Sequence, residues 1–151
     1  MKKIIIACVL VLVLMLAQVT HADAKKYKNN LKPTKSNIEW LARTIYAENG
    51  GARNNKTITL TGIVVCQRVR SSYFPNTIKK VISQKGQYST WSDGKIKNCK
   101  PSKKCYKIAK KILKKKLYLK YPKKLVFQSQ FKQGTKTYKY ITEDNEYFCL
   151  R

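Results

Sequence analysis

The sequence has 151 residues, of which 33 are lysine or arginine and only 7 are aspartate or glutamate, so its net charge is +26. Its one histidine, His21, lies in a segment that we expect to be removed. The mature chain then cannot use Ser-His-Asp or Cys-His nucleophiles or histidine-ligated zinc. If it is an enzyme, carboxylates are the main candidates for proton transfer, and no metal or cofactor is expected.

Residues 1–24 have the pattern of a secretory signal peptide. Lys2 and Lys3 precede 14 apolar residues, 4–17, and an Ala-x-Ala site ends at Ala24. The alternative is an uncleaved membrane anchor, but a membrane-spanning helix needs about 20 apolar residues. We therefore predict an exported protein with a basic N-terminal arm at 25–37 and one compact domain at 38–151, which is monomeric.

The second half of the chain is rich in lysine. Seventeen lysines, no arginine and no acidic residue lie between Asp93 and Glu143. Such a charge attracts anionic partners. Proteins that read nucleic acid favour arginine, of which this chain has five, so no specific nucleic acid is expected. Export favours an extracellular polyanion such as teichoic acid, or an anionic membrane surface. The alternative is a lysine-biased composition without a partner.

The first predicted helix covers residues 37–49. Ser36 and Glu39 form a capping box at its start, and Gly50-Gly51 ends it. Glu39 and Arg43 are spaced as an i,i+4 pair on the side that we expect to face solvent. The opposite side carries the apolar residues Ile38, Leu41 and Ile45.

Glu48 is the next position on this apolar side, in the last turn of the predicted helix. Burial disfavours the ionised carboxylate, and so does the negative end of the helix dipole. Both effects favour a protonated acid near neutral pH, which is what a general acid for glycosidic bond cleavage requires. The alternative is a side chain that simply reaches solvent at a frayed helix end.

Further along the chain the pattern changes from helix to strand. Residues 57–69 are rich in β-branched residues and could form a strand, but the length of the segment favours a buried helix, and periodicity alone does not decide between them. Asn76 is expected to cap a short helix, a long loop spans 84–96, and Ser102 is expected to cap a helix to about residue 119. Strands follow at 125–127, 137–141 and 147–150. Helices followed by a small C-terminal antiparallel sheet give an α+β class.

Four cysteines remain after residue 24. In an exported chain they could form two disulfides in three possible pairings, of which Cys99 with Cys105 is the most local. Free buried cysteines are the alternative. An all-cysteine zinc site is not expected, because the chain has no closely spaced C-x-x-C pairs.

Five motifs follow one another in order: Leu-Ala-Arg-Thr-Ile-Tyr-Ala-Glu at 41–48, Gly-Ile-Val-Val-Cys-Gln-Arg-Val at 62–69, Phe-Pro-Asn-Thr-Ile at 74–78 with Val-Ile at 81–82, Gly-Gln-Tyr-Ser at 86–89 with Asp-Gly-Lys-Ile at 93–96, and Val-Phe-Gln at 126–128 with Tyr-Phe-Cys at 147–149. Together they resemble the SleB-type cell-wall hydrolase family, whose members include spore cortex-lytic enzymes active in germination. Four residues depart from the family pattern. Ala52 and Arg53 stand where a second acidic residue is frequent, Gln67 replaces asparagine, and Glu146 replaces histidine.

The resemblance implies a lysozyme-like fold and a secreted, wall-associated lytic transglycosylase. Peptidoglycan glycan strands would be the substrate and Glu48 the catalytic acid and base. The residues expected to bind substrate are Gln87, Tyr88, Ser89, Trp91, Asp93 and, less directly, Tyr46.

Two alternatives remain open. A hydrolytic muramidase needs a second carboxylate, for which Asp93 is the best candidate in the sequence. An inactive cationic protein that binds walls or membranes would need no catalytic carboxylate.

Overall fold

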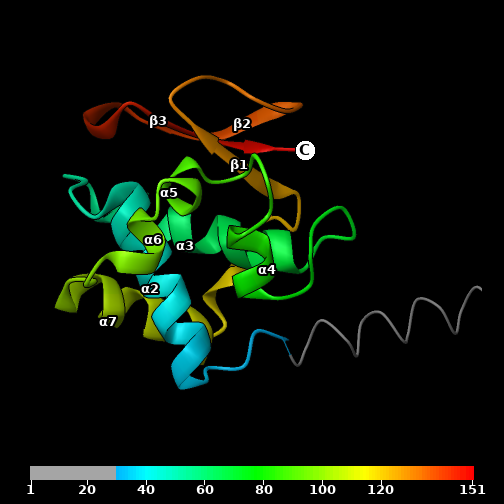
Figure 1. The fold of residues 1–151 in the computed structure, drawn as a ribbon. Coiled ribbons are helices and arrows are strands. Elements are labelled where there is room, and N and C mark those ends of the chain that lie inside the picture. The colour runs from blue at the N-terminus through cyan, green and yellow to red at the C-terminus, as the bar shows by residue number, and fades with distance from the viewer. Residues whose placement is uncertain (1–29) are drawn as a thin grey trace, which may run out of the picture.

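The computed structural model describes residues 30–151, so the predicted signal peptide and the first residues of the predicted arm lie outside the described part. Within residues 30–151, six α-helices precede a three-stranded antiparallel sheet, which lies across one end of the helical part (Figure 1). The predicted α+β class, mainly helical with a small C-terminal sheet, is confirmed. No helix in the described part is long and apolar enough to cross a membrane.

Helix α2 (Lys35–Asn49) begins earlier than the capping box predicts. Its N-cap is Thr34, whose hydroxyl accepts a hydrogen bond from the Asn37 backbone N–H at 3.2 Å, and Ser36 lies inside the helix. The predicted Ser36 cap is therefore wrong. Leu31 is also buried, so the packed domain starts before the predicted boundary at residue 38.

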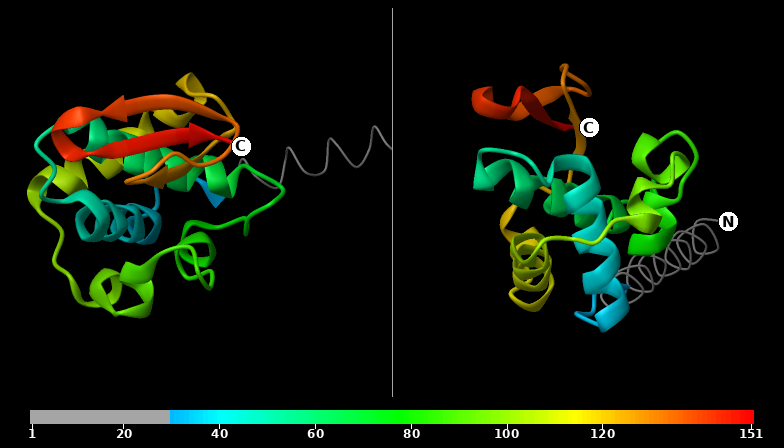
Figure 2. Two further views of the ribbon diagram at one scale, coloured as in Figure 1. Left: turned by 90° about the horizontal axis from the view of Figure 1, so that it is seen from above. Right: turned by 60° about the vertical axis from the view of Figure 1, so that its left-hand side comes forward.

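Helix α3 (Asn55–Val69) forms the centre of the domain and contacts α2, α7 (Lys103–Lys114) and the first strand (Figure 2). Burial on all sides explains why a β-branched segment is helical here, since tertiary packing overrides local propensity. Gly62 permits the close packing. A Cβ atom at this position would lie 2.6 Å from Ile112 Cδ1 and 2.8 Å from Ile45 Cδ1.

Two polar residues near the end of α3 are buried and bind backbone. The Gln67 amide donates to the Tyr118 carbonyl at 2.7 Å and to the Tyr121 carbonyl at 3.0 Å. Arg68 Nε donates to the Val126 carbonyl at 2.8 Å. The glutamine that departs from the family pattern thus holds the segment after α7.

The loop predicted at 84–96 contains two short helices, α5 (Ser89–Ser92) and α6 (Lys95–Asn98). Before it lies α4 (Ile78–Ile82), which is capped by Thr77 and not by the predicted Asn76. Ser102 caps α7 as predicted, but α7 ends at Lys114. A separate 3₁₀ turn, η1 (Leu117–Lys120), replaces its predicted last turn.

The three predicted strands are confirmed as β1 (Leu125–Ser129), β2 (Lys136–Ile141) and β3 (Glu146–Leu150). The order β1-β3-β2 places the last strand in the centre of the sheet. Phe148 on β3 is fully buried beneath it. All four cysteines in the described part are free thiols, so neither of the possible disulfides is present.

A 3₁₀ turn before β3, η2 (Thr142–Asp144), ties the sheet to the start of α3. The Asp144 carboxylate accepts hydrogen bonds from the Thr57 hydroxyl at 2.5 Å and from the backbone N–H groups of Arg53 and Asn54. Partial burial acts to raise the pKa of Asp144, but these hydrogen bonds outweigh it and the pKa is lowered. A negative charge is also favourable beside a helix N-terminus.

We expect Asp144→Asn to destabilise the protein at neutral pH by about 1 kcal/mol, the usual net contribution of a hydrogen bond. Because the folded-state pKa is lowered, the stabilisation is present above the unfolded-state value and is lost as pH falls through the folded-state pKa. Urea unfolding of both proteins at pH 7 and in strong acid measures this. A difference in stability that is unchanged in strong acid would contradict the role of the charge.

Candidate active site

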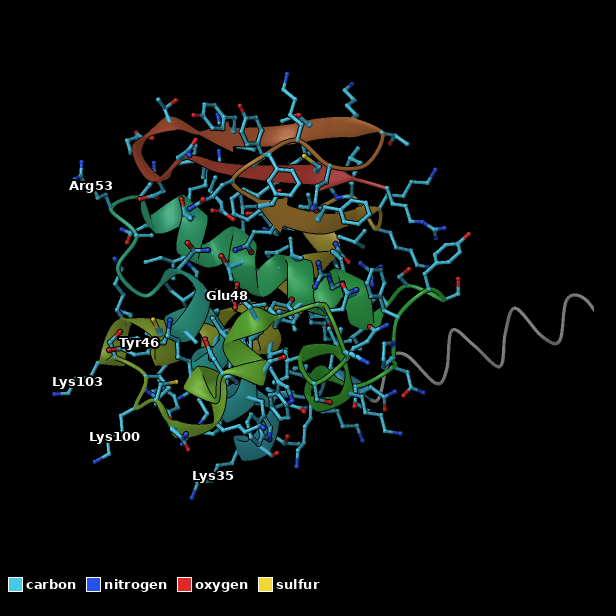
Figure 3. All side chains as sticks on the ribbon, turned by 45° about the horizontal axis from the view of Figure 1, so that its top comes forward. Lys35, Tyr46, Glu48, Arg53, Lys100 and Lys103 are labelled. Atoms are coloured by element: carbon cyan, nitrogen blue, oxygen red, sulfur yellow. The ribbon has the colours of Figure 1, made fainter. Side chains whose placement is uncertain are left out.

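Glu48 lies in the last turn of α2, where the helix approaches α5 and the start of α3 (Figure 3). Its side chain is neither fully buried nor freely exposed. The Thr90 hydroxyl, from α5, donates a hydrogen bond to Glu48 Oε1. Next to it, the Asn49 amide donates to the Thr61 hydroxyl of α3 at 3.0 Å, which fixes the end of α2.

The surroundings of Glu48 raise its pKa. Burial is the largest cause, and the charge of Asp93 acts in the same direction. The hydrogen bond from Thr90 and the positive charges of Arg68 and Lys95 oppose it. A raised pKa favours the protonated form of the acid, while the opposing groups stabilise the carboxylate that remains after the proton is donated.

Arg68 was not predicted as a site residue, yet it organises this region. Its guanidinium lies over the rings of Phe74 at 5.2 Å and Tyr88 at 5.0 Å. Arg68 is only 5% exposed, and its Nη1 has no hydrogen-bond partner among the described residues. The positive charge of Arg68 favours the anionic form of Glu48.

The predicted binding residues of the 84–96 loop occupy different environments. Tyr88 is buried against Arg68, and burial raises its pKa. Gln87 is half-buried, whereas Ser89 is exposed at the start of α5. Trp91 packs against Trp40 with ring centroids 5.7 Å apart, so part of its ring surface is used in a contact within the protein.

The remaining two predicted residues are more exposed. Asp93 ends α5, and its carboxylate accepts a hydrogen bond from the Lys95 backbone N–H at 2.9 Å and lies 3.8 Å from Lys95 Nζ. Tyr46 is 39% exposed and points away from Glu48 on the same helix (Figure 3). The structure thus brings Glu48, Thr90, Tyr88 and Arg68 together, with Asp93 at the edge and Tyr46 outside.

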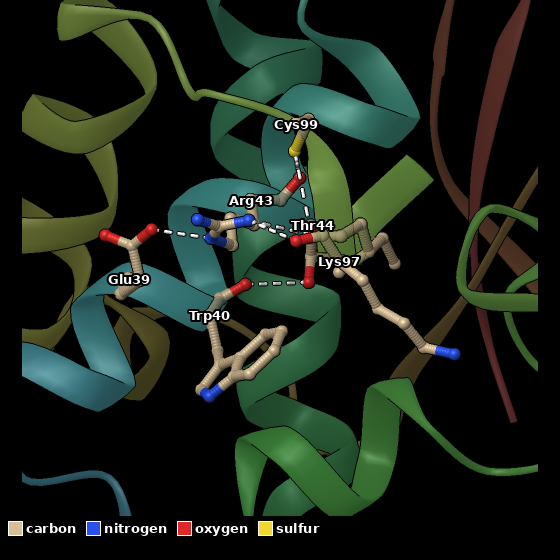
Figure 4. A network of polar contacts seen from close by, with 7 residues as sticks. Glu39, Trp40, Arg43, Thr44, Lys97 and Cys99 are labelled. Carbon is tan, nitrogen blue, oxygen red and sulfur yellow. Dashed lines mark hydrogen bonds and ion pairs between the residues drawn. The ribbon is translucent and has the colours of Figure 1, made fainter. Parts of the chain in front are cut away.

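A network on the outer side of α2 holds α6, and with it the loop, in place (Figure 4). Arg43 pairs with Glu39 at 2.5 Å, as predicted, and also donates to the Lys97 carbonyl at 2.6 Å. Cys99 Sγ donates to the Arg43 carbonyl at 3.7 Å. This side of α2 was predicted to face solvent. That prediction is correct only in part, because α6 lies against this side, while the side chains of Arg43 and Glu39 remain 24% and 31% exposed.

Glu146, at the start of β3, is a second carboxyl near Glu48 that stood out in the sequence only as a departure from a family pattern. It is 7% exposed. Burial is the main reason that the pKa of Glu146 rises to about 7, and the charges of Glu48 and Asp144 raise it further, against a hydrogen bond with Gln128. In the part of the chain described, no group of three or more histidine, cysteine or acidic residues is placed to hold a metal ion.

The fold is similar to that of two solved catalytic domains. One is the catalytic domain of the germination-specific lytic transglycosylase SleB from Bacillus anthracis, with 20% identity, a TM-score of 0.59, and coverage of 77% of this chain and 95% of that chain. The other is the catalytic domain of the Bacillus cereus SleB protein, with 19% identity, a TM-score of 0.58, and coverage of 77% and 91%. At such identities the likeness establishes the fold, in agreement with the predicted lysozyme-like class.

No match was found among the curated proteins. The model of the cell wall hydrolase family matches residues 55–148, which is more than half of the chain. This match confirms the family that the sequence motifs indicate. The chain therefore belongs to the cell wall hydrolase family, whose enzymes cleave peptidoglycan.

Proposed function

We propose that this protein is a secreted lytic transglycosylase that cleaves the glycan strands of peptidoglycan, with Glu48 as its only proton-transferring residue. The observation that carries the proposal is the position of Glu48, half-buried at a helix end, bonded to Thr90 and with a raised pKa. The similar Bacillus anthracis domain is a lytic transglycosylase, which supports the reaction type. The basic and apolar pattern of residues 1–24 supports secretion.

In this mechanism the protonated Glu48 donates its proton to the glycosidic oxygen as the bond from the anomeric carbon of N-acetylmuramic acid breaks. The Thr90 hydroxyl and the charge of Arg68 stabilise the carboxylate that forms. Glu48 then accepts the proton of the muramic C6 hydroxyl while that oxygen closes on the anomeric carbon. The product is a 1,6-anhydro end, and Glu48 is protonated again.

The substrate supplies its own nucleophile in this reaction, so no second carboxylate has to activate water. That fits the geometry of Asp93, whose carboxylate is bound within its own turn by Lys95. Hydrolysis remains the second candidate, because Glu146 places another carboxyl near Glu48. The purified protein should leave a cleared band in a gel loaded with cell walls. A protein that only binds walls leaves none.

Asp93→Asn is expected to keep wall clearing within about tenfold of the wild type, which corresponds to roughly 1.4 kcal/mol in the barrier. Asp93 affects Glu48 through its charge, and it does not transfer a proton in this mechanism. Initial rates of turbidity loss with purified walls measure the effect. A loss of about 100-fold or more would indicate that Asp93 prepares water, since a general base contributes on that scale.

The lysine-rich surface is proposed to attract the enzyme to anionic wall polymers such as teichoic acid. In the described part, none of the exposed lysines of α7 forms an ion pair: Lys103, Lys104, Lys107, Lys110, Lys111 and Lys114. Unpaired ammonium groups on one helix present a continuous positive surface to an extended polyanion.

Wall binding is expected to fall steeply as salt rises, because charge interactions are screened over about 8 Å at physiological ionic strength. Lys104→Gln combined with Lys107→Gln and Lys111→Gln should weaken binding at low salt, while Lys79→Gln with Lys80→Gln on α4 serves as the control. Co-sedimentation with walls measures both. Binding that is insensitive to salt would point to sugar contacts in place of charge.

A further inference from the structure

An open groove lies between the start of α2 and α7, two helices that pack against each other (Figure 1). Its volume is about 660 Å³. Four exposed lysines border it, one from α2 and three from α7: Lys35, Lys107, Lys110 and Lys114. Charges from two helices therefore meet at one groove, which we call the α2–α7 groove.

The three groove lysines of α7 follow one edge of that helix. They are three and four residues apart, the spacing that keeps side chains on one face. At 1.5 Å per residue they extend over about 10 Å. The other exposed edge of α7 carries three lysines that do not line the groove, the last of them at the C-cap: Lys104, Lys111 and Lys115. The helix thus presents two sets of lysines of equal charge, and only one set borders the groove.

No acidic side chain neutralises the groove lysines. Among residues 30–151 the ion pairs are Arg43 with Glu39 and Lys95 with Asp93, so none of the four lysines has an acidic partner. Glu39 also lines the groove, but its carboxylate is paired with Arg43 at 2.5 Å. The groove therefore keeps the charge of its four ammonium groups, which favours an anionic ligand.

The surface between these charges is mainly apolar. Pro33, Ile38 and Tyr106 complete the lining. Ile38 and Tyr106 are half-buried and pack against the core. Lysine side chains also add hydrocarbon surface along their stems while their ammonium groups stay in solvent. A matching ligand therefore carries negative charges at intervals and hydrocarbon between them.

The groove is separate from the active site. It is bordered by the first turns of α2, whereas Glu48 lies in the last turn of the same helix. Thirteen residues of helix lie between Lys35 and Glu48, or about 20 Å along the axis, and Figure 3 shows the two side chains well apart. A ligand held in the groove leaves the surroundings of Glu48 free.

We propose that the α2–α7 groove binds a polymer of alcohol units joined by phosphodiesters, which is the chemistry of a teichoic acid. The phosphates lie against the ammonium groups, and the carbon chain between them covers Ile38 and Tyr106. Lysine binds phosphate as a compact point charge, whereas arginine is favoured for bidentate pairing with carboxylates. The groove thus holds the enzyme on the wall while Glu48 acts on the glycan. This inference names a site for the proposed attraction to wall polymers and rests on it.

The test is the affinity of the protein for purified poly(glycerol phosphate), measured by fluorescence titration at about 0.15 M salt, where distant charges are screened. A groove variant should bind about tenfold or more weakly, since each lysine beside a polyanion contributes severalfold. It combines Lys107→Gln, Lys110→Gln and Lys114→Gln.

The matched control removes the same charge from the other edge of α7. It combines Lys104→Gln, Lys111→Gln and Lys115→Gln, and its affinity should stay within about threefold of the wild type, because these lysines act only through the screened field. Polyglutamate is the control for the ligand. It should bind the wild type about tenfold more weakly, because its polar amide backbone would lie against apolar side chains.

Equal losses of affinity in the groove variant and its matched control would overturn the proposal, because binding would then depend only on the number of lysines. An unchanged affinity of the groove variant would overturn it as well. So would equal affinities of the wild type for polyglutamate and poly(glycerol phosphate), because the groove would then not select phosphodiesters.

The same proteins distinguish a failure of this inference from a failure of the proposed function. The groove variant should cleave a soluble glycan at the wild-type rate, because its substitutions lie far from Glu48. Equal binding losses in the two lysine variants, with cleavage intact, would remove only the groove. A wild type that binds poly(glycerol phosphate) through the groove but leaves no cleared band in a wall-loaded gel would refute the enzymatic function alone.

Discussion

Glu48→Gln is expected to lower the rate of wall clearing by at least about 100-fold, because general acid and base catalysis contributes roughly 10²–10⁴-fold. The amide keeps the size of the side chain and can still meet the Thr90 hydroxyl, but it cannot donate or recover the proton. Since Glu48 forms no ion pair with any residue of the described range 30–151, the melting temperature should change little. Turbidity clearing and thermal melting of the same preparation measure the two effects.

Glu39→Gln is the matched control for this experiment. It lies on the same helix and makes the same change of charge, but its partner is Arg43 on the outer side of α2. Its activity should stay close to that of the wild type. Substantial clearing by a folded Glu48→Gln protein would show that another group performs the proton transfer.

Phe148→Ala is expected to destabilise the protein by roughly 3–5 kcal/mol, the range for removing a large aromatic side chain from a core. Phe148 is fully buried on the central strand of the sheet. The loss should loosen the sheet, and with it the position of Glu146 and the hydrogen bonds of Asp144. Urea unfolding, followed by circular dichroism, gives the change in the free energy of unfolding.

Phe131→Ala makes the same substitution at a position that is 63% exposed, so it should cost well under 1 kcal/mol. A similar loss of stability in both variants would contradict a core centred on Phe148 beneath the sheet. A loss confined to Phe148→Ala would locate the stabilising contact there.

The main elements of the fold could be predicted from the sequence because their signals are local. The apolar spacing of α2, the serine cap of α7 and the three strands all appear at the predicted places. The exact starts of α2 and α4 could not be predicted from the sequence. Thr34 and Ser36 are equally suitable N-cap residues for α2, as are Thr77 and Asn76 for α4. Which of them caps a helix depends on the approach of the preceding chain.

The candidate site could be predicted only where one helix determines it. Glu48 follows from the spacing of α2 alone. Thr90 and Arg68 reach it from α5 and α3, and their contacts join residues 20 to 42 positions apart, which no local pattern encodes. Glu146 was visible as an unusual residue, but its burial depends on the order of strands in the sheet.

On the outer side of α2, a contact within the helix could be predicted from the sequence, but the packing of another helix against it could not. The Glu39 and Arg43 pair was correctly predicted from i,i+4 spacing. The exposure of this pair to solvent could not be predicted, because the i,i+4 spacing is the same whether solvent or another helix lies against the pair. In this fold α6 covers it in part, and Arg43 Nη1 donates to the backbone carbonyls of Ile96 and Lys97 in that helix.

Mass spectrometry of the fragments that the wild-type enzyme releases from isolated walls tests the central claim most directly. The mechanism requires that the muramic C6 hydroxyl, and not water, attacks the anomeric carbon while Glu48 transfers the proton. The released muropeptides should then end in 1,6-anhydro-N-acetylmuramic acid, lighter by one water than the hydrolysed form, and should not be reducible by borohydride. Fragments with ordinary reducing ends, heavier by that one water, would contradict it.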